Sequence, residues 1–230
     1  MADGAEAGLQ IEVLNRRLAE VWQRIERAGG SRETVTLVAV TKTFPIEYVQ
    51  AALTVGLDDI GENYAQDLAE KDDQAKALGL RPRWHFIGGL QRNKVKLLAG
   101  RVALWQTVDR LALVDEIAKR DPGARVLIQV NTTDEAQKSG CQPSEARSLV
   151  EHGRDCGLIV EGLMTIGPTG PGGTGGDPRP AFDSLHDLAD ACEVDQLSMG
   201  MTADFELAVA AGSTMVRIGS ALFGPRTTGR

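Results

Sequence analysis

The run VTLVAVT at residues 35–41 decides the fold class, because a short apolar run rich in β-branched residues predicts a buried strand. An amphipathic helical pattern follows it from Ile46 to Val55, and seven further apolar runs repeat this arrangement along the chain. They lie at residues 57–60, 83–88, 102–108, 125–131, 158–167, 195–200 and 214–219. Eight candidate strands therefore alternate with helical stretches.

This alternation predicts βαβ units and a parallel sheet. Eight strands in 230 residues favour a closed (β/α)8 TIM-type barrel over an open doubly wound sheet, and no GxGxxG motif follows a strand. Ahead of the first strand, apolar residues from Ile11 to Ile25 recur at helical spacing, and Gly29-Gly30 ends the pattern. We expect this extra N-terminal helix to complete the outer ring of a single α/β domain over residues 1–230.

The amino-acid composition argues against several classes of function. The chain has 25 Lys and Arg against 32 Asp and Glu, and this net charge of −7 argues against nucleic-acid and membrane-surface partners. Three cysteines without a CxxC pair indicate reduced thiols rather than a disulfide framework. No apolar run reaches the roughly 18 residues of a membrane span, and the N-terminus lacks a signal-peptide core. We expect a cytoplasmic protein.

Lys42 ends the first predicted strand, on the side where barrel enzymes keep their active sites. Partial desolvation at the end of an apolar strand favours the neutral amine, which can form an imine with an aldehyde. The alternative is a lysine that only extends its charge to the rim of the barrel. Position alone leaves both interpretations open.

A candidate phosphate site surrounds the last two predicted strands. Gly219 and Ser220 would let backbone N–H groups approach an anion, since glycine carries no Cβ. Thr202 could donate its hydroxyl to a phosphate, cap the helical run that follows it, or do both. Arg217 lies within an apolar strand and needs an acceptor, for which a ligand is one candidate.

For several other residues, an ordinary structural role stands beside a role in a functional site. Asn63 follows the second predicted strand and forms, with Gln66, a variant capping box, so a site residue and a helix cap are both open. His85 fits a buried histidine with satisfied hydrogen bonds. The three histidines show no metal-ligand spacing with the cysteines or with each other, so we expect no metal site. The Gly- and Pro-rich stretch 167–180 is a surface insertion or a substrate lid.

Six runs occur in a diagnostic order between about residues 10 and 225. They are AVTKTFP, IGENYAQD, WHFIGGLQRNKVK, LIQVNTTDEAQKSG, GLMTIGP and LSMGMTADFELAVAAGSTMVRIGSALFG. Together they resemble the YggS/PROSC family, the pyridoxal 5′-phosphate (PLP) homeostasis proteins. The resemblance implies a fold similar to the N-terminal barrel of alanine racemase, and PLP held as a Schiff base on a lysine.

The resemblance also implies six cofactor-binding positions, with no catalytic residue and no metal ligand. Lys42 in AVTK matches the Schiff-base lysine, and Arg217 in RIGS matches the arginine that faces the pyridine nitrogen. The other four are Asn63 in the pocket lining, Thr202 where the family usually has serine, and Gly219 with Ser220 in the phosphate-binding turn. Two departures are Gly89, where the family usually has histidine, and the absence of a tyrosine after Arg226.

Three functions are compatible with these residues: a PLP carrier or regulator, a PLP-dependent amino-acid racemase, and a Schiff-base aldolase. An arginine can only donate to the ring nitrogen and keeps the pyridine neutral, which makes PLP a weak electron sink. We expect no second domain after the barrel, and only Tyr48 and Tyr64 are available as tyrosine bases. The sequence therefore favours a monomeric PLP carrier that is not an enzyme, with PLP-dependent apo-enzymes as candidate recipients.

Overall fold

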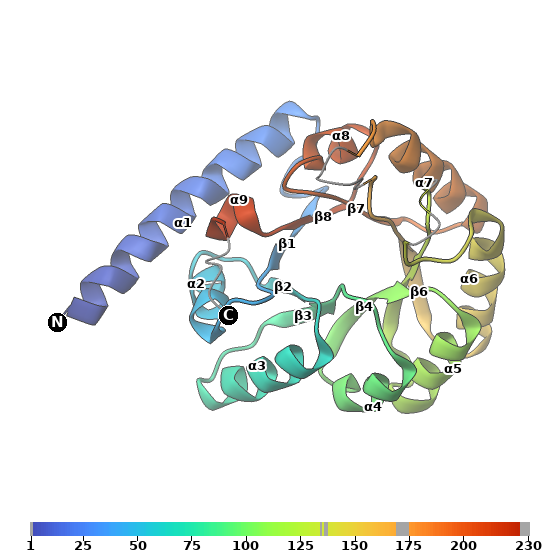
Figure 1. The fold of residues 1–230 in the computed structure, drawn as a ribbon, viewed down its shortest axis with the longest axis horizontal. Coiled ribbons are helices and arrows are strands. Elements are labelled where there is room, and N and C mark those ends of the chain that lie inside the picture. The colour runs from blue at the N-terminus through green and yellow to red at the C-terminus, as the bar shows by residue number, and fades with distance from the viewer. Residues whose placement is uncertain (1, 134, 136–137, 169–174, 226–230) are drawn as a thin grey trace.

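Each of the eight apolar runs forms a strand in the computed structural model, which describes residues 2–133, 135, 138–168 and 175–225. The strands are β1 Thr36–Val40, β2 Asp59–Glu62, β3 Arg83–Phe86, β4 Val102–Val108, β5 Arg125–Gln129, β6 Ile159–Met164, β7 Gln196–Met201 and β8 Met215–Ile218. Every strand pairs in parallel with its neighbours in chain order, and β8 closes on β1 with Arg217 opposite Val38. The predicted TIM-type barrel is confirmed (Figure 1).

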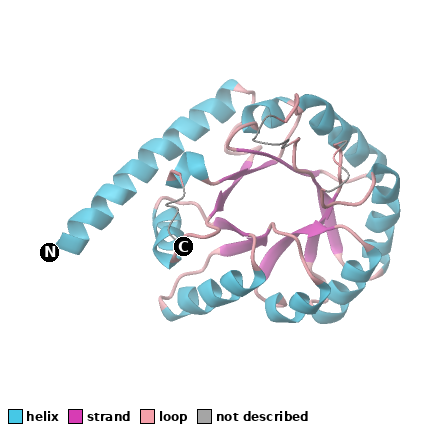
Figure 2. Ribbon diagram, in the orientation of Figure 1, coloured by secondary structure: helices cyan, strands magenta, loops and turns pink. Residues whose placement is uncertain are grey.

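Helices connect consecutive strands and surround the barrel (Figure 2). They are α1 Ala2–Arg27, α2 Ile46–Thr54, α3 Ala65–Ala77, α4 Val95–Leu98, α5 Leu111–Arg120, α6 Ala146–Asp155, α7 Arg179–Cys192, α8 Phe205–Ala210 and α9 Ser220–Phe223. Short 3-10 turns at Arg92–Lys94 and Pro143–Glu145 precede α4 and α6. A helical crossover is the usual way to join neighbouring parallel strands.

Apolar side chains fill both faces of the sheet, because a strand sends successive residues to opposite sides. In β1, Leu37 and Ala39 belong to the large core between strands and helices, while Val38 belongs to a separate cluster. The members of that second cluster are Val38, Leu104, Leu127, Met164 and Met215. This inner cluster fills the barrel, so the barrel has a packed core and is not a pore.

The predicted N-terminal helix is α1, and it covers the part of the ring that the short α9 leaves open (Figure 1). Its buried face, which includes Leu14, Leu18 and Val21, packs against α2, α8 and α9. Arg17 NH1 also donates to the Leu222 carbonyl of α9 at 3.1 Å. The extra helix therefore supports the turn after β8.

Three other predictions concern features outside the barrel. No helix in the described part of the chain is both long and apolar enough to cross a bilayer. Cys141, Cys156 and Cys192 are free in the structure. Residues 169–174 of the Gly- and Pro-rich stretch lie outside the described residues, so the choice between an insertion and a lid stays a prediction.

Candidate functional site

A cavity of about 300 Å³ opens at the carboxyl ends of the strands. All six residues that the sequence singled out line it, namely Lys42, Asn63, Thr202, Arg217, Gly219 and Ser220. The remaining lining consists of Val40, Phe44, Ile87, Ile166, Met201, Ala203 and Gly224. The cavity is thus mainly apolar with a few polar groups, as is usual for sites that bind small molecules.

Lys42 stands in the turn that follows β1. The turn is closed by a hydrogen bond from the Phe44 N–H to the Thr41 carbonyl at 3.0 Å. Thr43 has a φ of 67°, which is rare for a β-branched residue and marks a constrained backbone. Lys42 itself is half-buried. This tight turn holds the lysine at the mouth of the barrel.

A buried ion pair that sequence reasoning missed supports the same turn. Lys71 Nζ lies 2.5 Å from Glu62 Oε1 and 2.8 Å from the Thr41 carbonyl oxygen. The Thr41 hydroxyl donates to the same Glu62 oxygen at 2.6 Å. Burial raises the pKa of Glu62 even though the Lys71 charge opposes the shift. Because Thr41 precedes Lys42, this pair fixes the backbone from which Lys42 projects.

Arg217 is buried in β8 and keeps its charge. It donates to the Ser198 hydroxyl at 2.6 Å and to the Thr165 carbonyl at 2.8 Å. Desolvation lowers the pKa of Arg217 to about 10, so the guanidinium stays protonated at neutral pH. Over the described ranges, no carboxylate forms an ion pair with it. Two of its five N–H groups are used by these contacts, which leaves donors for an acceptor in the cavity.

A chain of hydrogen bonds runs from Arg217 through the barrel. Ser198 Oγ donates to Gln106 Oε1 at 2.7 Å, and Gln106 Nε2 lies 2.7 Å from His85 Nδ1. His85 Nε2 lies 3.0 Å from Asp59 Oδ1. Since the amide nitrogen can only donate, His85 Nδ1 is the acceptor and the ring proton sits on Nε2. In this series of hydrogen bonds, each group therefore donates to the next one in the direction of Asp59, away from the cavity.

Asp59 anchors the far end of this chain at the start of β2. Arg83 donates to both carboxylate oxygens, at 2.8 and 2.6 Å. Burial alone would raise the pKa of Asp59, but the hydrogen bonds from Arg83 and His85 hold it well below its usual value. The prediction that His85 is buried and satisfied is confirmed. The series of hydrogen bonds therefore has the Arg217 cation at the cavity end, the Asp59 carboxylate at the other end, and neutral side chains between them.

Asn63 carries an unsatisfied acceptor. Its Oδ1 is buried and has no hydrogen-bond partner among the described residues, although such atoms are normally paired. The helix cap left open as an alternative for Asn63 and Gln66 does not form, because Tyr64 precedes α3 without a side-chain cap and Gln66 Nε2 donates to Glu70 at 3.4 Å. Gly88 fixes the asparagine backbone, since a Cβ at residue 88 would lie 1.9 Å from the Asn63 carbonyl oxygen. A donor on a ligand would satisfy Asn63 Oδ1.

Thr202, Gly219 and Ser220 meet where β7 and β8 end. Thr202 Oγ1 accepts a hydrogen bond from the Ala221 N–H in the first turn of α9, at 3.3 Å. Of the roles left open for Thr202, the cap on the following helix does not form, because α8 begins only at Phe205 and Thr202 makes no hydrogen bond to its N–H groups. An oxygen that accepts from the backbone retains its own hydrogen to donate. The hydroxyl can therefore serve a ligand that also reaches the turn at Gly219.

Gly89, the first departure from the family pattern, lines a neighbouring hollow of about 320 Å³ that shares Asn63 with the cavity. Tyr64 also lines this hollow and is 56% exposed. A Cβ at residue 89 would meet no heavy atom within 4 Å. The hollow thus has room for the side chain that Gly89 lacks. The second departure, after Arg226, lies outside the described residues.

The sequence and the fold have counterparts among known proteins. The family model "Alanine racemase, N-terminal domain" matches residues 15–227. The chain is 38% identical over 229 residues to the pyridoxal phosphate homeostasis protein of Haemophilus influenzae, covering 93% of this chain and 96% of that one. It is 44% identical over 239 residues to the human protein of the same name, covering 95% and 86%. PipY of Synechococcus elongatus PCC7942, solved with PLP bound, superposes with a TM-score of 0.78 at 26% identity, covering 92% and 100%.

Proposed function

Because this chain belongs to the family of the alanine racemase N-terminal domain, and within it to the pyridoxal phosphate homeostasis proteins, we propose that it binds PLP in the cavity at the top of the barrel. The observation that carries the proposal is the convergence of an amine, a buried guanidinium, an unsatisfied amide oxygen and a hydroxyl on one cavity. PLP supplies a reactive aldehyde and an electron-poor ring when it is bound.

Each of the polar cavity residues has a distinct role in the proposed binding of PLP. The Lys42 amine binds the aldehyde carbon as an imine, and one water molecule is released. Arg217 donates a hydrogen bond to the ring nitrogen, and Asn63 Oδ1 accepts one from the ligand. Thr202 and the turn at Gly219 and Ser220 donate to the phosphate. A Schiff-base aldolase without PLP would have no use for the buried Arg217, which disfavours that alternative.

We propose further that the protein holds PLP without turning over amino acids. Of the described residues that line the cavity, only Lys42 and Arg217 have ionisable side chains, and an arginine does not give up its proton in proteins. Tyr48 stacks on Phe44 with ring centroids 4.4 Å apart and does not line the cavity, and Tyr64 lines the neighbouring hollow. Two-sided proton transfer needs a base on each face of the substrate. This lining supports a carrier or regulator and disfavours a racemase.

We also propose recipients for the bound PLP. An accessible cavity with one reactive amine suits release of PLP to other proteins, and PLP-dependent apo-enzymes are the recipients that we propose. The monomeric state and the cytoplasmic location expected from the sequence stay predictions.

The test has two arms on the purified full chain. An absorbance spectrum and the mass of the released cofactor report whether PLP is bound, and we expect one PLP per chain. The loaded protein is then incubated with L- and D-amino acids in deuterated water, and exchange at Cα is followed. We expect no saturable exchange at enzymatic rates. Exchange at about 1 s⁻¹ or faster would favour the racemase, and absence of PLP would overturn the binding proposal.

A further inference from the structure

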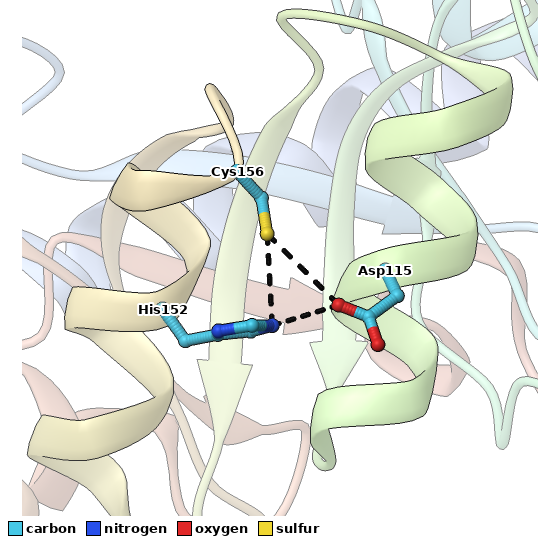
Figure 3. Close-up of side chains that lie close together, drawn as sticks. All are labelled: Asp115, His152 and Cys156. Atoms are coloured by element: carbon cyan, nitrogen blue, oxygen red, sulfur yellow. Dashed lines mark hydrogen bonds and ion pairs between the residues drawn. The ribbon is translucent and has the colours of Figure 1, made fainter.

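Three potential metal ligands converge on the outer surface of the helix ring, away from the PLP cavity. Asp115 lies on α5, while His152 and Cys156 lie on and just after α6, which packs against α5 (Figure 3). His152 Nε2 is 2.7 Å from Asp115 Oδ1 and 3.6 Å from Cys156 Sγ. Cys156 Sγ is 3.9 Å from Asp115 Oδ1. All three side chains are reachable from solvent.

The sequence already contained part of this arrangement. His152 and Cys156 are four residues apart, and helical positions at that spacing lie on one face. The expectation that no histidine stands at ligand spacing from a cysteine is therefore corrected. The third ligand comes from α5, and its approach depends on how two helices pack, which no motif encodes.

The geometry is typical of a metal site rather than a nucleophile triad. In a triad, one imidazole nitrogen takes the proton of the nucleophile and the other is held by the carboxylate. Here the same nitrogen, His152 Nε2, faces both Cys156 Sγ and Asp115 Oδ1 (Figure 3). The three atoms thus converge on one point and do not form a relay.

The separations are close to those around a tetrahedral zinc ion. Zn–S and Zn–N bonds of about 2.3 and 2.0–2.1 Å place sulfur and nitrogen about 3.5 Å apart at tetrahedral angles. The observed separation of Sγ from Nε2 is 3.6 Å, and that of Sγ from Oδ1 is 3.9 Å. Only the 2.7 Å contact between Nε2 and Oδ1 must widen. The Asp115 side chain is 60% exposed, so it can move by the required amount.

The charges around the sulfur also favour a cation. The Asp115 carboxylate oxygen Oδ1 lies 3.9 Å from Cys156 Sγ, so a thiolate at this position would be repelled by its negative charge. A bound divalent cation would replace this repulsion by attraction and stabilise the thiolate.

We propose that Asp115, His152 and Cys156 form a binding site for a thiophilic divalent cation such as Zn²⁺, with solvent in the fourth position. Bonds form from the metal to Sγ, Nε2 and Oδ1, and the thiol proton passes to solvent. Three protein ligands and one open position are a common zinc arrangement. The bound metal would tie α5 to α6.

The test is a titration of the metal-free full chain with Co²⁺, followed by displacement with Zn²⁺. We expect one Co²⁺ per chain and a thiolate-to-cobalt absorbance band that Zn²⁺ abolishes. Cys156→Ser should remove the band. His152→Gln and Asp115→Asn should each weaken binding by more than about tenfold, since even outer-shell partners cost tenfold or more in affinity. His186→Gln, an exposed histidine on α7, is the matched control and should bind as the parent does.

Two outcomes would overturn the site: no thiolate band in the parent protein, or a band that persists in Cys156→Ser. The PLP absorbance of each variant separates loss of metal from loss of fold, because the cluster does not line the cavity. We expect that absorbance to be unchanged in Cys156→Ser. Excess Zn²⁺ should raise the Tm of the parent by several degrees and leave that of Cys156→Ser unchanged.

Discussion

Arg217 owes its orientation to residues from three other strands or strand ends. Its N–H groups donate to the Ser198 hydroxyl within β7 and to the Thr165 carbonyl just after β6, and Ser198 in turn donates to Gln106 in β4. A guanidinium with two fixed contacts has little freedom to rotate, so its remaining N–H groups are held toward the cavity. Ser198 is therefore a positioning residue for Arg217.

Ser198→Ala tests this positioning. The change removes an acceptor from Arg217 and a donor from Gln106, and we expect PLP affinity to fall several-fold and stability to fall by about 1–3 kcal/mol. Arg217→Ala should cost more in affinity, about tenfold to a hundredfold, because a charge-assisted hydrogen bond to the ligand is lost. PLP titration and urea unfolding measure the two effects.

Ser213→Ala is the matched control for Ser198→Ala. Ser213 is also buried, and its hydroxyl contacts the carbonyls of Leu197, Met199 and Met215 instead of Arg217. It should lose stability and keep its PLP affinity. Equal affinity losses in the two serine variants would show that Ser198 acts only through the fold.

A pH-dependent effect is expected from Lys71→Met. Removal of the ammonium leaves Glu62 unpaired in the core, which typically costs about 3–5 kcal/mol at neutral pH. The folded pKa of Glu62 is already raised, and it rises further without Lys71. The native state then holds a proton that the unfolded chain releases, so the stability of the variant must fall as pH rises from 5 to 7.

Urea unfolding of Lys71→Met at pH 5 and pH 7 measures this slope. Lys76→Met is the control on the same helix, because Lys76 is 61% exposed and its pair with Asp72 is worth little. A destabilisation of Lys71→Met that is the same at both pH values would contradict the buried-carboxylate explanation.

At the scale of elements, the turn from β8 into α9 is the part of the site that depends most on its neighbours. α9 is only four residues long, and α1 supports it through Arg17 and through its apolar face. Phe223 packs against Phe44 and Tyr48, which links α9 to the turn that carries Lys42. The phosphate end and the lysine end of the cavity are thereby held together.

Thr202→Val and Ser220→Ala test the phosphate end. Each should weaken PLP about tenfold or more, because a hydrogen bond to a charged group is lost, and should weaken pyridoxal much less. Parallel titrations with the two ligands give the comparison. Similar losses for PLP and pyridoxal would place these residues away from the phosphate.

The strands were predictable and the helix ends less so. Parallel strands are buried on both faces and read as apolar runs, and this pattern is weakest at residues 57–60 and 195–200, where β2 and β7 form. The helix cap left open for Thr202 does not form, because its hydroxyl accepts a hydrogen bond from Ala221, nineteen residues away, and makes none to the nearby helix. A capping pattern records only local contacts, whereas the ends of barrel strands meet residues from the adjacent loop.

At the scale of the whole molecule, the closed barrel brings together residues from position 42 to position 220. The carboxyl ends of all parallel strands lie at one end of a barrel, so residues that follow different strands converge there. This rule, together with the family resemblance, made the six cavity residues predictable. The pair of Glu62 with Lys71 and the chain from Arg217 to Asp59 were not, because they depend on strand register and side-chain direction inside the barrel.

The most direct test of the central claim, that Lys42 binds PLP, is borohydride reduction of the loaded protein followed by peptide mass mapping. We predict one pyridoxyl-phosphate adduct, on Lys42, and loss of both the adduct and the imine absorbance in Lys42→Ala. Lys138→Ala is the control, because Lys138 follows β5 at the same end of the barrel and donates to the Gly167 carbonyl. It should keep the adduct. A stable adduct on Lys138 or another lysine, or full retention of the adduct in Lys42→Ala, would contradict the account.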